Sequence, residues 1–394
     1  MSKTIVAGGG IGGLATAVSL AARGHRVTVL ERRDEFSEYG AGIQLGPNAF
    51  HALDSLGIGD AVRDRAVFID ALQLMDGTTG DRVARLPLTE TYRARFGNPY
   101  AVVRRADLYE PLLDACRASD LIELRTGSAV VRYEQDHTHA HAVAADGIRH
   151  TGTALIGADG IRSTIRQQLI GDGEPRVSGH TIYRSVIPME KVPQELRTNS
   201  VTLWAGPRWH FVHYAIDGGA SLNLAATRDD AATEAIAAVP TPRDHVLGEF
   251  PGMSERARAL LELGEEWRAW VLCDRDPVRD WSYGRVALLG DAAHPMLQYA
   301  AQGACMALED AVVLGHLLED GDADAVPQRL EKYTAERRER TAKTQCVARE
   351  LGRRIYHPEG EGALARNAAL SAMSDAELHD TVAWLHGGQG VRGL

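Results

Sequence analysis

The fold is decided close to the N-terminus, where residues 3–13 read KTIVAGGGIGG. Residues 3–7 are a short apolar run of the kind that forms a buried parallel strand. Gly8, Gly10 and Gly13 then match the pattern G-x-G-x-x-G. In that pattern the first glycine permits a tight turn, the second lets a pyrophosphate approach the backbone, and the third lets a helix pack on the strand. The stretch therefore predicts the first strand, turn and helix of a dinucleotide-binding fold.

The next residues continue a βαβ pattern. Residues 14–23 have the apolar spacing of a helix, whose N-terminus would offer free N–H groups and a partial positive charge to phosphates. Residues 26–30 read RVTVL and predict a second strand. Glu31 follows that strand, where a carboxylate in this fold receives a ribose hydroxyl. The alternative is a glycine-rich turn with an ordinary surface glutamate, but the order of strand, turn, helix, strand and acid favours a cofactor site.

Length and composition are those of an ordinary enzyme. The chain has 394 residues, more than one core usually holds, so we expect two domains. A net charge of −10 without any basic run argues against nucleic-acid binding. The four cysteines lack the spacing of a metal site, so we expect reduced thiols in a cytoplasmic protein without a bound metal. The sequence contains neither a signal peptide nor the roughly 20 apolar residues of a transmembrane segment.

Two later segments have the character of further parts of the same site. Residues 157–163 read GADGIRS, and residues 290–295 read GDAAHP. The second segment follows an apolar run at 286–289 that predicts a buried strand, and an apolar helix opens at residues 302–303. A lone glycine fingerprint is weak evidence, whereas three glycine-rich segments in this order are hard to obtain by chance.

With these segments the chain resembles the single-component FAD-dependent aromatic hydroxylases, over roughly residues 3 to 345. The resemblance implies an α/β fold with a Rossmann-like FAD-binding domain, an inserted mixed β-sheet substrate domain and C-terminal helices. It also implies FAD as cofactor, NADH or NADPH as a transient electron donor, and molecular oxygen as co-substrate. The expected divisions are residues 1–70, 99–178 and 271–320 for the FAD-binding domain, 71–98 and 179–270 for the substrate domain, and 321–394 for the C-terminal helical segment.

The resemblance assigns a set of residues to FAD. They surround its pyrophosphate, adenosine, ribityl chain and isoalloxazine, and they are Gly8, Gly10, Ile11, Gly12, Gly13, Glu31, Arg32, Gly42, Gln44, Arg105, Val130, Asp159, Asp291, Gly303 and Ala304. The dipole of the helix that opens at 303 would stabilise an anionic reduced flavin. Each residue also has a structural reading: Arg105 as a surface ion pair, Asp159 as a turn residue, and the helix as plain core.

The substrate domain shows strand-like alternation at residues 181–186, 201–204 and 210–214. The last run places His210 and Tyr214 on one face and His213 on the other. The chain most resembles the 3-hydroxybenzoate 6-hydroxylases, in which a histidine and a tyrosine four residues later meet the substrate phenol. The resemblance implies this role for His210 and Tyr214, and His213 keeps a structural reading.

Gln298 departs from the pattern of many relatives, which carry proline at this position. The 3-hydroxybenzoate 6-hydroxylases have Gln-Tyr there, as this chain does, whereas salicylate hydroxylases generally keep the proline. An amide can hydrogen-bond a phenol and orient its ring, which proline cannot do. Gln298 therefore favours a different ring orientation, and the alternative is that it only caps the following turn.

The C-terminal part is expected to be helical. Residues 328–354 have helix-compatible spacing with Leu330 and Tyr333 inward, and residues 336–340 read ERRER, a solvated face or a subunit contact. Residues 375–385 suggest a short terminal helix, and residues 387–394 are expected to be frayed.

The resemblance implies NADH- or NADPH-consuming hydroxylation of a small phenolic acid through a C4a-hydroperoxyflavin. We expect para-hydroxylation of 3-hydroxybenzoate to gentisate. A free phenol has a pKa of about 10, so a positioned base must take its proton at neutral pH. His210 is the candidate base, and Tyr214 and Gln298 complete the network around the phenol.

Several alternatives stay open. Salicylate hydroxylation to catechol, or hydroxylation of another phenolic or heteroaromatic substrate, would use the same fold. A flavin oxidoreductase without oxygen insertion is another class, although the sequence lacks a second glycine fingerprint and a C-x-x-C pair, and Trp267–Trp270 differs from the W-x-W-x-I-P motif of halogenases. A non-catalytic flavin-binding or assembly protein is a further class. The oligomeric state is open, with a homodimer as one arrangement.

Overall fold

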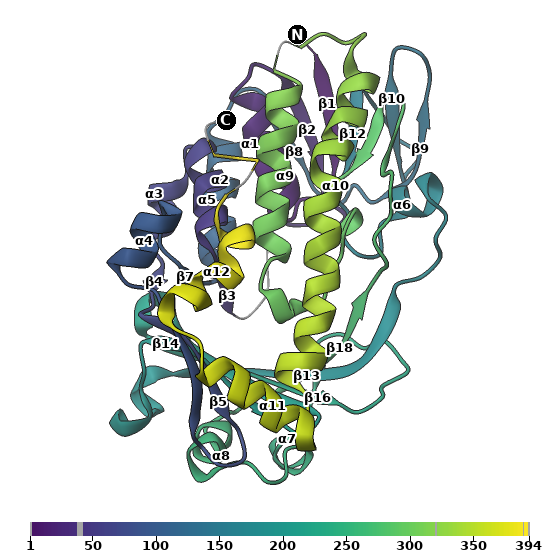
Figure 1. Ribbon diagram of the computed structural model, residues 1–394. Helices are drawn as coiled ribbons and strands as arrows, with labels where there is room; N and C mark the ends of the chain where they lie inside the picture. Colours follow the sequence, from purple (N-terminus) through teal and green to yellow (C-terminus); the bar gives the residue numbers. More distant parts are fainter. Residues whose placement is uncertain (1, 38–41, 320, 389, 393–394) are drawn as a thin grey trace.

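The computed structural model describes residues 2–37, 42–319, 321–388 and 390–392. Figure 1 shows one large sheet in the upper half of the view and another in the lower half, with the C-terminal helices in front of them. No helix in these ranges combines the length and the hydropathy of a membrane span. The predicted α/β class is confirmed, and the expected domain boundaries stay a proposal.

The upper sheet is built around the predicted strand, turn and helix. β1 (Lys3–Ala7) and β2 (Arg26–Leu30) are parallel and have the predicted bounds. α1 (Ile11–Ala21) begins directly after the glycine turn, earlier than predicted. The strand order is β19-β20-β12-β1-β2-β8. The other strands are β8 (Ile122–Arg125), β12 (Ala154–Gly157), β19 (Ser282–Tyr283) and β20 (Val286–Leu288).

The central strands of this sheet are apolar because other elements cover both of its faces. α1 packs against α5 (Arg105–Arg117) and α9 (Gly303–Leu317), and α10 (Val326–Leu351) lies beside α9. Two small sheets have the orders β11-β10-β9 and β3-β7-β4. Their strands are β3 (Gly42–Leu45), β4 (Val67–Phe68), β7 (Ala101–Arg104), β9 (Val130–Gln135), β10 (Ala140–Ala144) and β11 (Arg149–Gly152). Short helices are α2 (Pro47–Ser55), α3 (Gly59–Arg63), α4 (Glu90–Phe96) and α6 (Thr164–Leu169).

The lower sheet has eight strands in the order β17-β18-β13-β16-β15-β14-β5-β6. It is mixed, because β14 pairs parallel with β5 and the other pairs are antiparallel. The three predicted runs lie in β13, β14 and β15. The strands are β5 (Ala71–Asp76), β6 (Arg82–Pro87), β13 (Arg176–Pro188), β14 (Ser200–Gly206), β15 (Trp209–Ile216), β16 (Ser221–Asp229), β17 (Val239–Pro240) and β18 (Arg268–Asp274).

The two faces of the lower sheet have different partners. One face packs on α7 (Arg243–Glu249) and α8 (Glu255–Glu262) through a core that includes Trp204 and Phe211. The opposite face, here called the inner face, carries His180, Arg184, His210, Tyr214 and Thr227. Apolar side chains of β7 and of the C-terminal helices pack against this inner face. The predicted separation of His210 and Tyr214 from His213 is confirmed.

The C-terminal part is helical, as predicted. α10 continues into a π-helical turn, η6 (Gly352–Tyr356), and then into α11 (Gly360–Ser371) and α12 (Asp375–His386). The frayed end predicted for residues 387–394 is wrong at Val391, which is 1% exposed and belongs to the core around α9. The prediction rested on the position of these residues at the chain end and on their glycine content. Burial of the Val391 side chain in the core holds this part of the chain in place nonetheless.

The prediction of a solvated face or subunit contact at residues 336–340 is wrong for two of its three arginines, Arg337 and Arg340. Arg337 is 1% exposed and donates to Asp310 Oδ1 at 2.7 Å and to Glu309 Oε2 at 2.8 Å. Arg340 donates to both Glu309 oxygens and to backbone carbonyls of α12. Burial alone would raise the pKa of the Asp310 carboxyl, but the neighbouring His294 and Arg337 lower this pKa to about 2. The arginines turn inward because α9 brings two carboxylates into the core between the helices.

Replacing Arg337 by methionine should lower the free energy of unfolding by roughly 3–5 kcal/mol, because two buried carboxylates lose a charged partner. Denaturation in urea measures the change. The control is Arg338→Met, at a neighbouring, partly exposed arginine, with an expected change below about 0.5 kcal/mol. Equal stability of Arg337→Met and wild type would contradict this account of the cluster.

Candidate active site

The glycine turn has the shape that a phosphate cradle needs. Gly8 has a φ of +112°, and a Cβ there would lie 2.3 Å from the carbonyl oxygen of Ala158. A Cβ on Gly13 would lie 1.9 Å from the oxygen of Gly8. At Gly10, by contrast, no heavy atom among the described residues lies within 4 Å of the added Cβ. The outer two glycines are thus required by packing, and the middle one faces open space at the position where the glycine pattern leads us to expect the pyrophosphate.

The carboxylate of Glu31 is held beside this turn. Its Oε2 accepts from the N–H of Gly9 at 2.8 Å, and its Oε1 accepts from the N–H of Arg33 at 2.9 Å. Tyr109 donates to the oxygen of Gly9 at 2.9 Å, a contact that sequence reasoning missed. Arg32, the next residue in the chain, is exposed. Ile11 and Gly12 lie in the first turn of α1, directly after the glycine turn.

Asp159 and Val130 meet at the start of α6. Asp159 Oδ2 accepts from the N–H of Thr164 at 2.9 Å, and the carbonyl oxygen of Val130 accepts from the Thr164 hydroxyl at 3.0 Å. The interpretation of Asp159 as a turn residue therefore accounts for one of its two carboxylate oxygens, Oδ2. Its Oδ1 is buried without a hydrogen-bond partner in the described part of the chain, and burial raises the pKa of this carboxyl. An orphaned buried acceptor is typical of a site whose ligand supplies the missing donor.

The first turn of α9 offers a second anion site. Gly303 and Ala304 are its first residues, so their N–H groups have no partner within the helix. Asp291 Oδ1 lies 3.8 Å from the position of a Cβ on Gly303. Gln302 is buried, accepts from Asn48 Nδ2 at 2.9 Å, and leaves its own Nε2 without a partner among the described residues. The sequence analysis placed Gln302 at the opening of this helix without assigning it a role, and its amide is a further orphan donor at the expected flavin site.

The loop expected near the isoalloxazine, residues 40–44, contacts the inner face of the lower sheet through Gly42. Residues 40 and 41 of that loop lie outside the described residues. Gly42 donates to Asn223 Oδ1 at 3.1 Å, and a Cβ on Gly42 would lie 2.4 Å from Tyr214 Cε2. Only glycine therefore lets β3 approach the inner face. Gln44 accepts from the Tyr100 hydroxyl at 2.7 Å.

The inner face brings the three predicted catalytic residues into one region. His210 is buried and pairs across the strands with Thr227 of β16. Gln298 donates to Thr227 Oγ1 at 3.4 Å and accepts from Arg184 Nη2 at 2.6 Å. Burial raises the pKa of Tyr214 to about 12, with a partial offset from Arg184, so its phenol is a neutral donor. The capping alternative for Gln298 is wrong, because its side chain bonds to the sheet instead of the turn.

Arg184 is a site residue that sequence reasoning missed. Its only signal was a charged residue at an inward position of the alternating run in β13. Burial lowers the pKa of Arg184, and Arg105 at the start of α5 adds to this effect. No acidic side chain in the described ranges forms an ion pair with it. A half-buried guanidinium without an anion is costly, which is typical of a site that receives one from a ligand.

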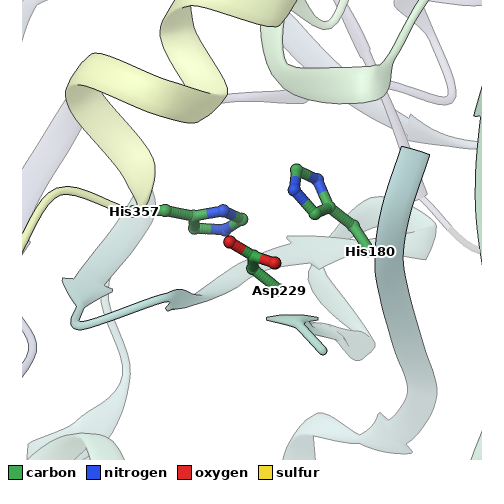
Figure 2. A group of neighbouring side chains, drawn as sticks. All are labelled: His180, Asp229 and His357. Carbon is green, nitrogen blue, oxygen red and sulfur yellow. The ribbon is translucent and has the colours of Figure 1, made fainter. Parts of the chain in front are cut away.

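A histidine cluster adjoins His210. His210 Nδ1 and His357 Nε2 are 2.7 Å apart. Figure 2 shows the side chains of His357, Asp229 and His180 pointing toward one another, and their ligand-type atoms lie within 4.8 Å of one another. A cation there would compete with Arg208, which donates to Asp229 Oδ1 at 3.1 Å.

His213 lies on the opposite face of β15. Its ring stacks on Trp204, and burial lowers its pKa to about 3. This placement agrees with the structural reading.

Comparisons with known proteins support the same cofactor. The model of the FAD binding domain family matches residues 1–206 and 257–348. The 3-hydroxybenzoate 6-hydroxylase 1 of Aquipseudomonas alcaligenes is 48% identical over 99% of this chain and 98% of its own. The 3-hydroxybenzoate 6-hydroxylase of Polaromonas naphthalenivorans is 44% identical over 97% and 95%.

Solved structures agree with this assignment. A salicylate hydroxylase substrate complex superposes with a TM-score of 0.85 at 26% identity, over 99% of this chain and 97% of its own. The predicted family, cofactor and enzyme class are confirmed. The chain belongs to the FAD-binding family of aromatic hydroxylases, flavoprotein monooxygenases that use FAD and NADH or NADPH.

Proposed function

We propose that this protein hydroxylates a phenolic aromatic acid, and that 3-hydroxybenzoate is converted to gentisate by hydroxylation para to its hydroxyl group. The observation that carries the proposal is the inner face, where a neutral base, a phenol, an amide and an unpaired cation lie together: His210, Tyr214, Gln298 and Arg184. The names of the similar 3-hydroxybenzoate 6-hydroxylases support the choice of substrate.

The residues that would hold FAD are the glycines of the turn, Ile11, Glu31 with Arg32, Gly42, Gln44, Arg105, Val130, Asp159, Asp291, Gly303 and Ala304. When bound, FAD supplies the electrons taken from NADH or NADPH and activates molecular oxygen. The protein's part is to orient the ring and to remove the phenolic proton.

His210 has the properties of a base. Burial lowers its pKa well below the ordinary value, with a further contribution from His357, so its ring is neutral at neutral pH. His357 occupies Nδ1, so Nε2 is the nitrogen through which His210 would accept the proton of the phenol.

Gln298 and Arg184 would orient the ring. Arginine can only donate, so the carbonyl oxygen of Gln298 faces Arg184 and its amide nitrogen faces Thr227. That nitrogen can donate to a phenolate oxygen. The remaining donors of Arg184 suit the carboxylate of the substrate.

The test of this proposal is product identity. The FAD-loaded protein is incubated with NADH or NADPH and with 3-hydroxybenzoate or salicylate, and the products are separated by chromatography. Gentisate from 3-hydroxybenzoate is the expected result. Catechol from salicylate with 3-hydroxybenzoate untouched would contradict the proposal and support the alternative suggested by the salicylate hydroxylase fold.

Replacing Arg184 by methionine should raise KM for 3-hydroxybenzoate by roughly 10- to 100-fold, because a hydrogen bond to a charged group contributes about 1.5–3 kcal/mol. The FAD content should not change. The control is 3-hydroxybenzamide, which has the same ring and hydroxyl group without a negative charge, and its KM should be similar for both proteins. Equal losses for the two compounds would show that Arg184 acts only through the position of Gln298.

A further inference from the structure

The C-terminal turn brings a second imidazole to the candidate base. The family model ends at residue 348, and His357 follows the turn η6 beyond that limit. His357 is 7% exposed and His210 is 1% exposed, and their bonded nitrogens are 2.7 Å apart. Two neutral imidazoles form such a bond only if one nitrogen donates and the other accepts. The pair can therefore transfer a proton along the bond.

The surroundings of this pair disfavour a positive charge on either ring. Burial, with a contribution from each neighbouring histidine, lowers the pKa of His210 well below its ordinary value and that of His357 to about 3. Tyr299 and Tyr356 pack edge-on against His210 and add no negative charge. A proton taken from a substrate would therefore be poorly held on His210 alone.

The far side of His357 leads toward solvent and toward a negative charge. Asp229 at the end of β16 and His180 of β13 face His357 in Figure 2, and both are partly exposed. The charge of Asp229 raises the pKa of His357, whereas those of Arg228 and Arg208 lower it. His180 is fixed by Tyr299, whose hydroxyl lies 2.5 Å from His180 Nδ1. Asp229 is thus the nearby anion toward which a proton would move.

We propose that His357 relays the phenolic proton from His210 to Asp229 and the solvent. The relay rests on the proposed function of His210 as the base. The O–H bond of the phenol breaks as an N–H bond forms at His210 Nε2. The Nδ1–H bond of His210 breaks as one forms at His357 Nε2, and the proton on His357 Nδ1 passes to Asp229 or to water. Each ring ends with one proton, on the other nitrogen, and the reverse transfer to the dihydroxy product restores both.

His357 does not touch the substrate in this relay, so it acts only through His210. His357→Gln separates a relay from simple orientation, because the glutamine amide can hydrogen-bond His210 Nδ1 but does not pass a proton on. His357→Ala removes both functions. The control is His379→Gln in the same C-terminal segment, which keeps a donor for the carbonyl oxygen of Pro87.

The measurements use the FAD-loaded protein with 3-hydroxybenzoate. The ultraviolet spectrum of the bound ligand, recorded against pH without NADH or NADPH, reports the pH at which the phenol ionises. For both His357 variants we expect this pH to rise by about one unit or more and kcat for hydroxylation to fall roughly 10- to 100-fold, within the range of general acid–base effects. KM and FAD content of the His357 variants should stay near the wild-type values, and the His379→Gln control should match wild type in all measurements. Added imidazole should restore part of the rate of His357→Ala.

Three outcomes would overturn the relay. If the bound phenol ionises at the same pH in His357→Gln as in wild type, and kcat is also unchanged, His357 only orients His210. Loss of turnover in chelator-treated wild type, restored by Zn²⁺, would show that His180, Asp229 and His357 hold a metal. If His357→Ala has wild-type phenol ionisation and kcat while His210→Ala is impaired, the relay is refuted and His210 keeps its role as the base. If His210→Ala is also normal in both measurements, the proposed function of His210 fails as well.

Discussion

Gly10→Val should produce a folded protein that has lost FAD. Gly10 has φ −77° and ψ −177°, an extended conformation that valine adopts, and a Cβ there meets no heavy atom of the described residues. The added side chain would instead fill the space in which the pyrophosphate approaches the backbone. We expect affinity for FAD to fall by at least about 100-fold, equivalent to ~2.7 kcal/mol. Flavin absorbance of the purified protein, before and after incubation with FAD, measures the loss.

Gly13→Ala is the matched control for this prediction. Its Cβ would lie 1.9 Å from the oxygen of Gly8, so the helix must move away from the turn. This variant should be destabilised by roughly 1–3 kcal/mol, the usual effect of overpacking. Circular dichroism during urea denaturation separates the two variants. A yellow Gly10→Val protein with wild-type flavin content would contradict the position assigned to the pyrophosphate.

His210→Ala should lower the rate of hydroxylation by about 10²–10⁴-fold, the usual contribution of general acid–base catalysis. The FAD content should be unchanged, because β15 lies outside the segments assigned to the cofactor. Oxidation of NADH or NADPH should continue, with oxygen released as hydrogen peroxide instead of entering the ring. Product chromatography together with a peroxide assay measures this uncoupling.

His213→Ala is the matched control on the same strand. His213 stacks on Trp204 on the face that packs against α7 and α8, so its loss should reduce stability without uncoupling hydroxylation. If His210→Ala turns over with full coupling, His210 is not the base. Uncoupling in His213→Ala alone would transfer that role to the opposite face of the sheet.

The part of the fold around the upper sheet and its glycine turn was largely predictable from the sequence. β1 and β2 have the bounds expected from their apolar runs, and Gly8 and Gly13 meet the steric limits that the glycine pattern implies. Alternation in β15 separated His210 and Tyr214 from His213. These features depend on neighbouring residues, so a local pattern is sufficient to predict them.

The errors concern residues whose environment is set by distant parts of the chain. The ERRER run was expected to form a solvated face or a subunit contact, yet α9 supplies the two carboxylates that draw Arg337 and Arg340 inward. Val391 was expected to fray, yet it enters the core around α9. Charge spacing within a helix predicts which residues share a face, but it does not predict what that face will contact.

The sequence by itself determined the βαβ unit, the glycine turn and the face on which His210 and Tyr214 lie, because strand period and glycine sterics act over a few residues. Only the tertiary structure decided that Arg184 donates to Gln298, 114 positions away, and that His357 bonds to His210, 147 positions away. No periodicity relates such residues. Their contact follows from the docking of the C-terminal segment and of the loop that holds Gln298 onto the inner face of the lower sheet.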